Sequence, residues 1–289
     1  MGTLFVVATP IGNLADMTFR GVETLKSVKY IAAEDTRHVA PLLRHYGINK
    51  YSLISLHKYN EMGKSKAILN RIIEEDCDIA LVSDAGTPCI SDPGGVLVAL
   101  AREKGIQVIG IPGASAMTLA LSISGLNLKN FSFLGFFPRE TKDKKKMVEL
   151  MKKSELSTFV IYESPLRILT TVKYLSECFS QGFGIVGNDL TKLFESTVSG
   201  YFTEIHRVLA ENTHVEKGEY VIVIEPRHEE EAIALELSLE AQLVNEMVLH
   251  NITMKDAIKK VAEKSKASKS NVYQASLQVK KLLKSPELH

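Results

Sequence analysis

The sequence predicts an α/β protein made of two α/β domains and a small helical module toward its C-terminal end. Short apolar runs alternate with helical patterns over the first half of the chain, and the alternation resumes after a dense aromatic stretch near residue 131. The last segment is rich in lysine and shows helical spacing alone. Alternating strands and helices are typical of a mostly parallel sheet with helices on both faces.

The first α/β domain is expected over residues 1–115. Apolar runs predict its strands at residues 4–8, 30–33, 79–82 and 108–111. Apolar residues at helical spacing predict helices between them, at residues 18–28, 39–46, 65–75 and 96–104. Gly47 stands where a helix C-terminus favours glycine.

The second α/β domain is expected over residues 116–227 and opens with a helix at 116–124. Its strands are predicted at residues 131–137, 158–162, 184–187, 198–202 and 219–225. The phenylalanines of the first of these strands are predicted to lie in the core rather than to stack on bases (Phe131, Phe133, Phe136 and Phe137). Residues 139–153 carry seven basic and three acidic side chains and are expected to form a basic linker.

A helical module is expected over residues 228–289, with a first helix at 232–250. Thr253 is predicted to cap a second helix with Asp256 at its N3 position, and Ser268 and Ser270 offer caps for a third. Residues 251–284 hold nine lysines and two acids. That charge on two helices joined by a tight turn resembles a helix-turn-helix, and a solvated amphipathic hairpin explains the pattern nearly as well.

Composition excludes several classes of protein. A formal net charge of +1 excludes a uniformly basic nucleic-acid binder. Three scattered cysteines without a C-x-x-C pair favour a reducing, cytoplasmic location. The start of the chain lacks the pattern of a secretion signal and no run is long enough to span a membrane, so no membrane partner is expected. His38 and His45 lack the spacing of a metal site, and no metal is expected.

Four turns that follow predicted strands are candidates for chemistry. They cover residues 9–13, 33–37, 83–95 and 110–115. Because the carboxyl ends of parallel strands meet at one edge of a sheet, these turns should line a single crevice with backbone amides, small residues and acids. The chain has no G-x-G-x-x-G followed by an acid, no P-loop and no G-x-S-x-G, which disfavours dinucleotide binding, phosphate-loop binding and serine hydrolysis.

Together these turns resemble the tetrapyrrole-methylase (class III methyltransferase) fold family, and more narrowly its ribosomal RNA branch. The matching segments in the first half are TPIGNLAD at 9–16, AEDTR at 33–37, LVSDAGTP at 81–88, SDPG at 91–94 and IPGAS at 111–115. The match extends through YESPLR at 162–167, LTK at 190–192, KGE at 217–219 and the basic C-terminal helices. One departure is Asn188-Asp189, where this branch usually has Arg-Glu.

The resemblance implies S-adenosylmethionine bound in a cleft between the two α/β domains. It implies 2′-O-methylation of a cytidine in 16S ribosomal RNA of the small subunit, carried out by a homodimer. Asp84 is the candidate polar anchor of the cofactor, with Ala85, Gly86, Ser115 and Ala116 supplying backbone contacts and room. Pro10, Tyr162 and Gly218 complete the implied pocket.

Methylation of a ribose hydroxyl calls for a general base. The matched motifs nominate Glu34, Asp35, Glu163 and Lys192 for base or positioning roles. Helix capping by Glu34 or Asp35, and an ordinary ion pair for Lys192, are the structural alternatives.

Contact with RNA phosphates is expected from basic side chains in three parts of the chain. The candidates are Arg37, Arg167, Lys144, Lys145, Lys259 and Lys269. Two other functions share the fold or the basic tail: methylation of a tetrapyrrole or corrin precursor, and non-catalytic RNA binding by a ribosome-assembly factor.

Overall fold

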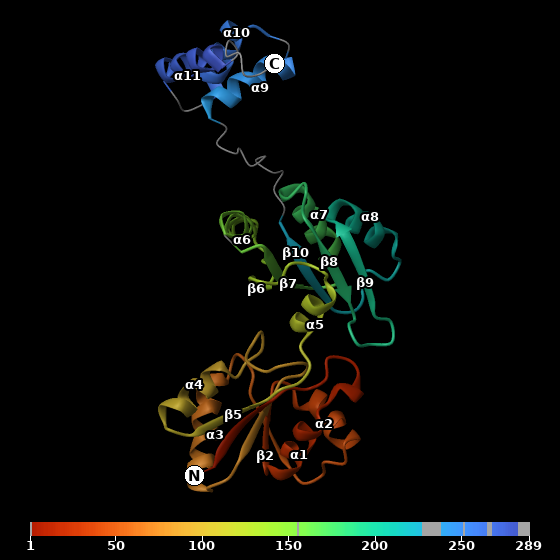
Figure 1. Cartoon of the computed structure of the whole chain (residues 1–289). Helices are drawn as coiled ribbons and strands as arrows, with labels where there is room; N and C mark the ends of the chain where they lie inside the picture. Colours follow the sequence, from red (N-terminus) through yellow and green to blue (C-terminus); the bar gives the residue numbers. More distant parts are fainter. Residues whose placement is uncertain (1, 155, 227–237, 251, 265–267, 283–289) are drawn as a thin grey trace. The chain divides into compact units, whose positions relative to one another are not determined.

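The computed structural model of the chain describes residues 2–154, 156–226, 238–250, 252–264 and 268–282 (Figure 1). The chain divides into two compact units, residues 1–228 and 229–289. The first unit contains two separate five-stranded sheets, each with its own helices. The boundary that the sequence places near residue 115 falls inside this unit and stays a prediction.

The first sheet is parallel throughout, as the alternating pattern predicts. Its strands stand in the order β3-β2-β4-β1-β5. They are β1 (Thr3–Val7), β2 (Tyr30–Ala33), β3 (Ser52–Ser55), β4 (Ile79–Val82) and β5 (Gln107–Ile111). The short edge strand β3 was not predicted from the sequence, because serines at both ends leave only Leu53 and Ile54 as an apolar signal.

Helices cover both faces of the first sheet. Helices α1 (Phe19–Ser27) and α2 (Thr36–His45) pack on one face, and α3 (Glu61–Glu74) and α4 (Gly95–Glu103) pack on the other (Figure 1). Successive side chains of a strand point to opposite faces. Accordingly Ile31 lies in the core beneath α1 and α2, while its neighbour Ala32 lies in the core beneath α3 and α4.

The second sheet is mixed, in the order β6-β7-β10-β8-β9. Only β6 and β7 are parallel; the other neighbouring pairs are antiparallel. The strands are β6 (Phe131–Phe136), β7 (Thr158–Glu163), β8 (Phe183–Asn188), β9 (Ser196–Tyr201) and β10 (Tyr220–Glu225). Helix α5 (Ala116–Ile123) packs on one face, and α6 (Thr141–Lys153), α7 (Ile168–Cys178) and α8 (Phe202–Glu211) share the core on the other.

The basic segment 139–153 is not a linker, so that prediction was wrong. It forms α6 from Thr141 onward, with Val148 and Met151 buried. Lysine is a good helix former. The apolar residues that reveal a helical period stand only in its second half, which hid the helix among charges.

The C-terminal unit has a core of its own. Its helices α9 (Leu239–His250), α10 (Met254–Lys264) and α11 (Lys269–Leu282) bury Leu243, Val261 and Val272 against one another. The Thr253 hydroxyl accepts a hydrogen bond from the Asp256 N–H at 3.3 Å, which confirms the predicted cap. The part of the predicted helix at 232–237 lies outside the described residues.

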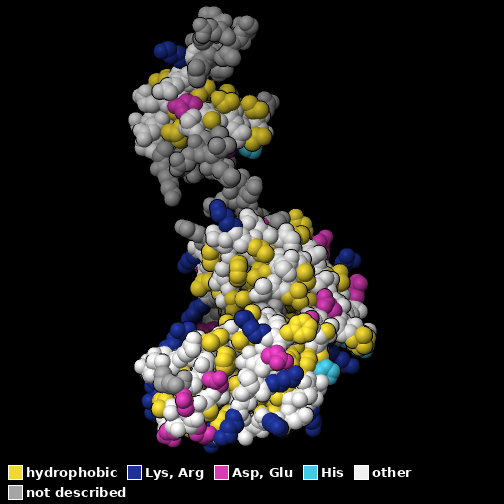
Figure 2. Space-filling view, turned by 60° about the horizontal axis from the view of Figure 1, so that its bottom comes forward, with side chains coloured by type: hydrophobic (Ala, Val, Ile, Leu, Met, Phe, Trp, Pro, Cys, Tyr) yellow, Lys and Arg dark blue, Asp and Glu magenta, His cyan; other side chains and the backbone are white. Residues whose placement is uncertain are grey.

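No helix in the described part of the chain is long and apolar enough to cross a membrane. On the face shown in Figure 2, Lys and Arg side chains of the first unit are interspersed with Asp and Glu. That mixture agrees with a formal net charge of only +1.

The loop between β4 and α4 is held at its far end by Glu61, the first residue of α3. The Glu61 carboxylate accepts hydrogen bonds from the Gly94 N–H at 2.7 Å and the Val96 N–H at 3.0 Å. Gly94 has a φ of +127°, and a Cβ there would stand 2.6 Å from Leu81 Cδ2. The carboxylate satisfies two amides at the start of α4, where a negative charge also favours the helix dipole.

We expect Glu61→Ala to lower the free energy of unfolding by about 1–2 kcal/mol, because it leaves both amides without their acceptor. Glu61→Gln keeps a carbonyl oxygen and should lose less. Urea titration measures the change, with Glu74→Ala on the exposed end of the same helix as the control. A loss no larger than that of the control would contradict the capping role.

Candidate functional site

A cavity of about 470 Å³ lies where loops of the first sheet meet strands and loops of the second. All four predicted turns contribute to it, which confirms that they reach a common crevice. Its wall is formed by Ile11, Glu34, residues 84–87 and 90–92, Ser115, Ala116, Phe136, residues 162–165, Leu190 and residues 219–221. Its volume is typical of a site for a small molecule.

Six of the eight residues expected at the cofactor line this cavity: Asp84, Ala85, Gly86, Ser115, Ala116 and Tyr162. Pro10 and Gly218 do not, although their neighbours Ile11 and Glu219 do. Gly218 has a φ of +87°, and a Cβ there would lie 2.5 Å from the Asn188 side-chain oxygen. Its role in this structure is therefore to let the chain pass close to residues 188 and 189.

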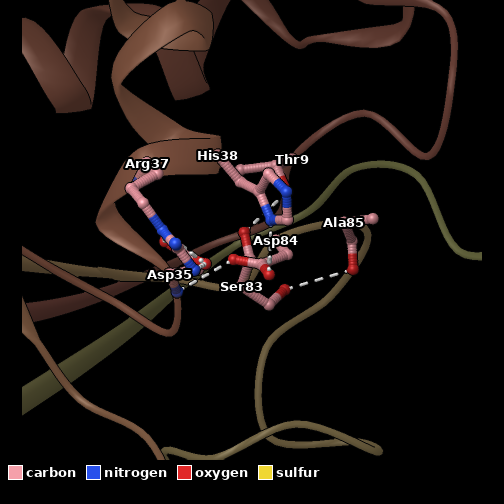
Figure 3. A network of polar contacts seen from close by, with 7 residues as sticks. All are labelled: Thr9, Asp35, Arg37, His38, Ser83, Asp84 and Ala85. Atoms are coloured by element: carbon pink, nitrogen blue, oxygen red, sulfur yellow. Dashed lines mark hydrogen bonds and ion pairs between the residues drawn. The ribbon is translucent and has the colours of Figure 1, made fainter.

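Backbone hydrogen bonds join the loops that follow β1 and β4. The Thr9 N–H donates to the Gly86 carbonyl at 2.9 Å, and the Gly86 N–H donates to the Thr9 carbonyl at 3.0 Å. The Thr9 hydroxyl donates to the Ser83 carbonyl at 3.3 Å (Figure 3). Gly86 has a φ of +79°, a conformation that glycine adopts without steric cost.

Asp84 ties the loop after β4 to the start of α2. One carboxylate oxygen accepts a hydrogen bond from the Asp35 N–H at 3.0 Å, and the other lies 3.0 Å from His38 Nδ1 (Figure 3). The hydrogen bond and the charge of Asp84 raise the pKa of His38 above its ordinary value. The side chain therefore shapes the loop, while it also forms part of the cavity wall.

Asp35 caps α2, so the structure adopts the capping alternative for this residue. Its carboxylate accepts from the Arg37 N–H at 2.9 Å and binds the Arg37 guanidinium, with Nη2 at 2.6 Å. Hydrogen bonds from the Arg37 side chain and backbone hold the pKa of Asp35 well below its usual range. Neither residue lines the cavity, and the Arg37 side chain is 87% exposed.

The buried carboxylate of Glu163 forms an ion pair with Arg167. The Glu163 side chain is fully buried, and Arg167 Nη2 lies 2.5 Å from Oε1. The Thr171 hydroxyl donates to Oε2 at 2.5 Å, and the Ser164 N–H donates to Oε1 at 2.6 Å. Arg167 also donates to the Pro138 carbonyl at 3.4 Å. These contacts make Glu163 and Arg167 a structural support of the cavity wall.

Lys192 is held between two carboxylates. Its ammonium donates to Asp189 at 2.7 Å and to Glu219 at 2.9 Å. Partial burial works to lower the pKa of Lys192, but these hydrogen bonds outweigh it and the pKa is raised. Asp189 also accepts a hydrogen bond from the Glu219 N–H at 3.2 Å. The aspartate that stands where this branch usually has glutamate therefore binds both Lys192 and the backbone of residue 219.

Glu34 is the one candidate base whose functional group has no hydrogen bond or ion pair to the described residues. Burial, followed by the charges of Asp92, Asp84 and Asp35, raises its pKa. Burial also raises the pKa of Asp92, against a hydrogen bond from Ser83. Both acids line the cavity.

The cavity wall is negatively charged. None of the described residues that line it is Lys, Arg or His, so Glu34 and Asp92 face the space without a cation beside them. No group of His, Cys, Asp and Glu in the described residues is arranged to hold a metal ion. The carboxylates of Glu34 and Asp92 favour positive charge in this space.

Aromatic residues of the second sheet form part of the cavity wall. Phe136, 57% exposed, stacks edge-on to Tyr162 with centroids 5.7 Å apart, and the Tyr162 hydroxyl accepts from the Met117 N–H at 3.2 Å. The prediction that these phenylalanines are core residues is confirmed for Phe137 and wrong for Phe131 and Phe136, which are exposed; Phe133 is partly buried against the core. No alternation in the sequence separates them. Asp92, by contrast, stands in the SDPG motif and could have been nominated from the sequence.

The expected RNA contacts are dispersed. Lys144 and Lys145 lie on α6, and Lys259 is exposed on α10. Lys269 is the first residue of α11, and its side chain lies outside the described part of the structure.

The fold of the first unit is that of a class of methylases. It is similar to uroporphyrin-III C-methyltransferase from Thermus thermophilus, with a TM-score of 0.55 at 16% identity, covering 78% of this chain and 95% of that one. A diphthine synthase gives a TM-score of 0.58 at 13% identity, covering 77% and 89%. Identities this low show the fold alone. A sequence model described as Tetrapyrrole (Corrin/Porphyrin) Methylases matches residues 3–206.

Relatives with higher identity narrow the assignment. Three proteins named ribosomal RNA small subunit methyltransferase I match along nearly their whole length. The protein from Xylella fastidiosa is 38% identical over 94% of this chain and 98% of its own. Those from Synechocystis and Bacillus subtilis are each 39% identical, over 96% and 95% of this chain and 99% and 94% of their own. The chain belongs to the tetrapyrrole methylase family, in its ribosomal RNA small subunit methyltransferase I branch.

We expect Glu163→Gln to lower the free energy of unfolding by roughly 3 kcal/mol, because it leaves the partly buried Arg167 guanidinium without its carboxylate. Urea titration measures the loss. Arg37→Ala, which breaks an exposed ion pair, is the control and should change stability by about 1 kcal/mol or less. Unchanged stability with lost activity would instead make Glu163 a catalytic group.

Proposed function

We propose that the chain uses S-adenosylmethionine to methylate the ribose 2′-hydroxyl of a cytidine in 16S ribosomal RNA of the small subunit. The observation that carries the proposal is the cavity, whose acidic wall matches a cationic donor. The names of the relatives support ribosomal RNA as the acceptor. A Thermus thermophilus structure of the same fold was solved with S-adenosylhomocysteine, the product of such a donor.

The residues present fit this cofactor. Its sulfonium and ammonium groups are cations, which the carboxylates of Glu34 and Asp92, with no basic side chain beside them in the cavity wall, would favour. Its adenine needs an apolar slot, and Ile11, Phe136 and Leu190 supply apolar surface in the same cavity. We assign its backbone contacts to Ala85, Gly86, Ser115 and Ala116. Asp84 and Gly218 shape the surrounding loops, Pro10 precedes Ile11 in the wall, and Tyr162 lines the same cavity.

We assign the general base to Glu34. When bound, S-adenosylmethionine supplies a methyl group activated by a sulfonium. Removing the proton from a ribose hydroxyl then requires a group that is unpaired and whose pKa is raised toward neutrality. Glu34 meets both conditions. Asp35, Glu163 and Lys192 are held by Arg37, Arg167 and two carboxylates respectively.

The remaining contacts belong to the RNA. Exposed Arg37 stands beside the loop that carries Glu34, and we assign it to a phosphate. Lys259 and Lys269 of the C-terminal unit are assigned to phosphates as well. The buried pair with Glu163 leaves Arg167 a supporting role. A cytoplasmic homodimer completes the proposal, from the cysteine usage and the family resemblance.

Transfer of tritium from labelled S-adenosylmethionine to small ribosomal subunits of a strain deleted for this chain tests the function. The expected result is label in 16S RNA, recovered as 2′-O-methylcytidine after digestion. RNA binding without transfer would favour an assembly factor, and label on a tetrapyrrole precursor alone would favour a small-molecule methylase.

Glu34→Gln should lower kcat by about 10²–10⁴-fold, because the amide accepts no proton. The acid limb of the pH–rate profile, where protonation of Glu34 switches the wild type off, should disappear in the variant. The adjacent Asp35→Asn is the control and should keep kcat within a few-fold while reducing stability. A Glu34→Gln enzyme with wild-type kcat would overturn the assignment.

Asp92→Asn should weaken S-adenosylmethionine binding by roughly 3–10-fold and hardly affect S-adenosylhomocysteine, which lacks the sulfonium charge. Burial raises the pKa of Asp92, so its carboxylate is protonated at a higher pH than usual. As the pH falls through that range, the wild type should lose affinity for the cationic donor, and the variant should lose less. Calorimetry with both ligands checks this; equal losses for the two would contradict it.

A further inference from the structure

Helix α6 carries an excess of positive charge that the cavity does not use. Its thirteen residues include six lysines and two acids. Val148 and Met151 turn its apolar side into the core of the second sheet. The lysines therefore divide between those that pack on the protein and those that face solvent.

Two of the six lysines lie over aromatic rings of α7 and of the residue that follows it. The Lys144 ammonium is 5.9 Å from the centre of the Tyr174 ring, and the Lys152 ammonium is 5.8 Å from that of Phe179. Cations are attracted to such ring faces, and the lysine stems cover apolar surface. Lys144, one of the candidates for RNA contact, is thus engaged with α7.

The other four form what we call the basic face of α6: Lys142, Lys145, Lys146 and Lys153. Within the described residues, no hydrogen bond or ion pair holds the ammonium of Lys142 or Lys145. Lys146 pairs with Asp143 at 3.1 Å and Lys153 with Glu149 at 3.7 Å, both on the exposed surface. Exposed pairs of this kind are weak and exchange readily for another anion.

A shallow groove runs along this face. It is lined by Lys145, Lys146, Glu149, Leu150, Lys153 and Ser154. Leu150, among these residues, is 53% exposed. Because helical residues rise 1.5 Å each, the charges from Lys145 to Lys153 extend over about 12 Å, enough to follow a chain of phosphates rather than a single one.

A short segment connects the cavity wall to the start of α6. Phe136 lines the cavity, and α6 starts at Thr141, five residues further along the chain. A segment of that length spans at most about 18 Å. The hydrogen bond from Arg167 to the Pro138 carbonyl joins this connection to the buried pair in the cavity wall.

We propose that the basic face of α6 binds the phosphates of the RNA strand whose ribose enters the cavity. This rests on the proposed function. A membrane surface fits less well, because α6 buries its apolar side in the core, whereas a helix that lies on a bilayer inserts that side. An acidic protein would not need to lie beside the cavity.

The test compares two double variants of the full chain that remove equal charge from the same helix. Lys142→Ala/Lys145→Ala removes the unpaired lysines, and Lys144→Ala/Lys152→Ala removes those over rings. Binding to a 16S RNA transcript is measured over a range of salt. The first variant should lower the slope of log K against log salt by about 1.4–1.8 and weaken binding about 10-fold at a fixed salt concentration. The second should change either value by less than half as much.

S-adenosylhomocysteine affinity should match wild type in both variants. A first variant with wild-type slope and affinity, or a second variant with an equal loss, would overturn the proposal. The proposal would also be overturned if the first variant kept its RNA binding but lost binding to vesicles of equal parts phosphatidylglycerol and phosphatidylcholine. Wild-type chain that fails to methylate small subunits overturns the proposed function instead.

Discussion

The cavity depends on the parallel pairing of the first sheet, which brings the ends of β1, β2, β4 and β5 to one edge. Loops that are up to a hundred residues apart in sequence begin there, side by side. The reciprocal Thr9–Gly86 hydrogen bonds and the Asp84 carboxylate then fix the loops to one another. Without that edge, neither the glycine turns nor the acids would share a space.

The same arrangement decides which charges remain available. Asp84 is engaged with α2, and the second sheet neutralises its own acids through the Glu163–Arg167 pair and through Lys192. What faces the cavity uncompensated is Glu34 and Asp92, both with a raised pKa. We infer that these two carboxylates favour a cationic donor.

Local patterns predicted the strands of the parallel sheet and the four turns, and they offered a helix cap by Glu34 or Asp35 as the alternative to catalysis, because each depends on residues close together in sequence. The buried contact of Glu163 with Arg167 was not predicted: spacing alone does not show that a helix and a strand enclose both groups. The exposure of Phe136 depends on how the two sheets meet. Helix α6 was not predicted, because its six lysines leave few apolar residues, such as Val148 and Met151, to show a helical period.

The most direct test of whether the carboxylates of Glu34 and Asp92 receive a cationic donor is the proton balance of binding. Calorimetry of S-adenosylmethionine with wild-type chain is carried out at mildly acidic pH in two buffers of different ionisation enthalpy. Because a bound cation lowers the pKa of nearby carboxyls, we predict that protons are released, and that S-adenosylhomocysteine releases fewer. Binding of S-adenosylmethionine without proton release, or with proton uptake, would contradict this role of Glu34 and Asp92.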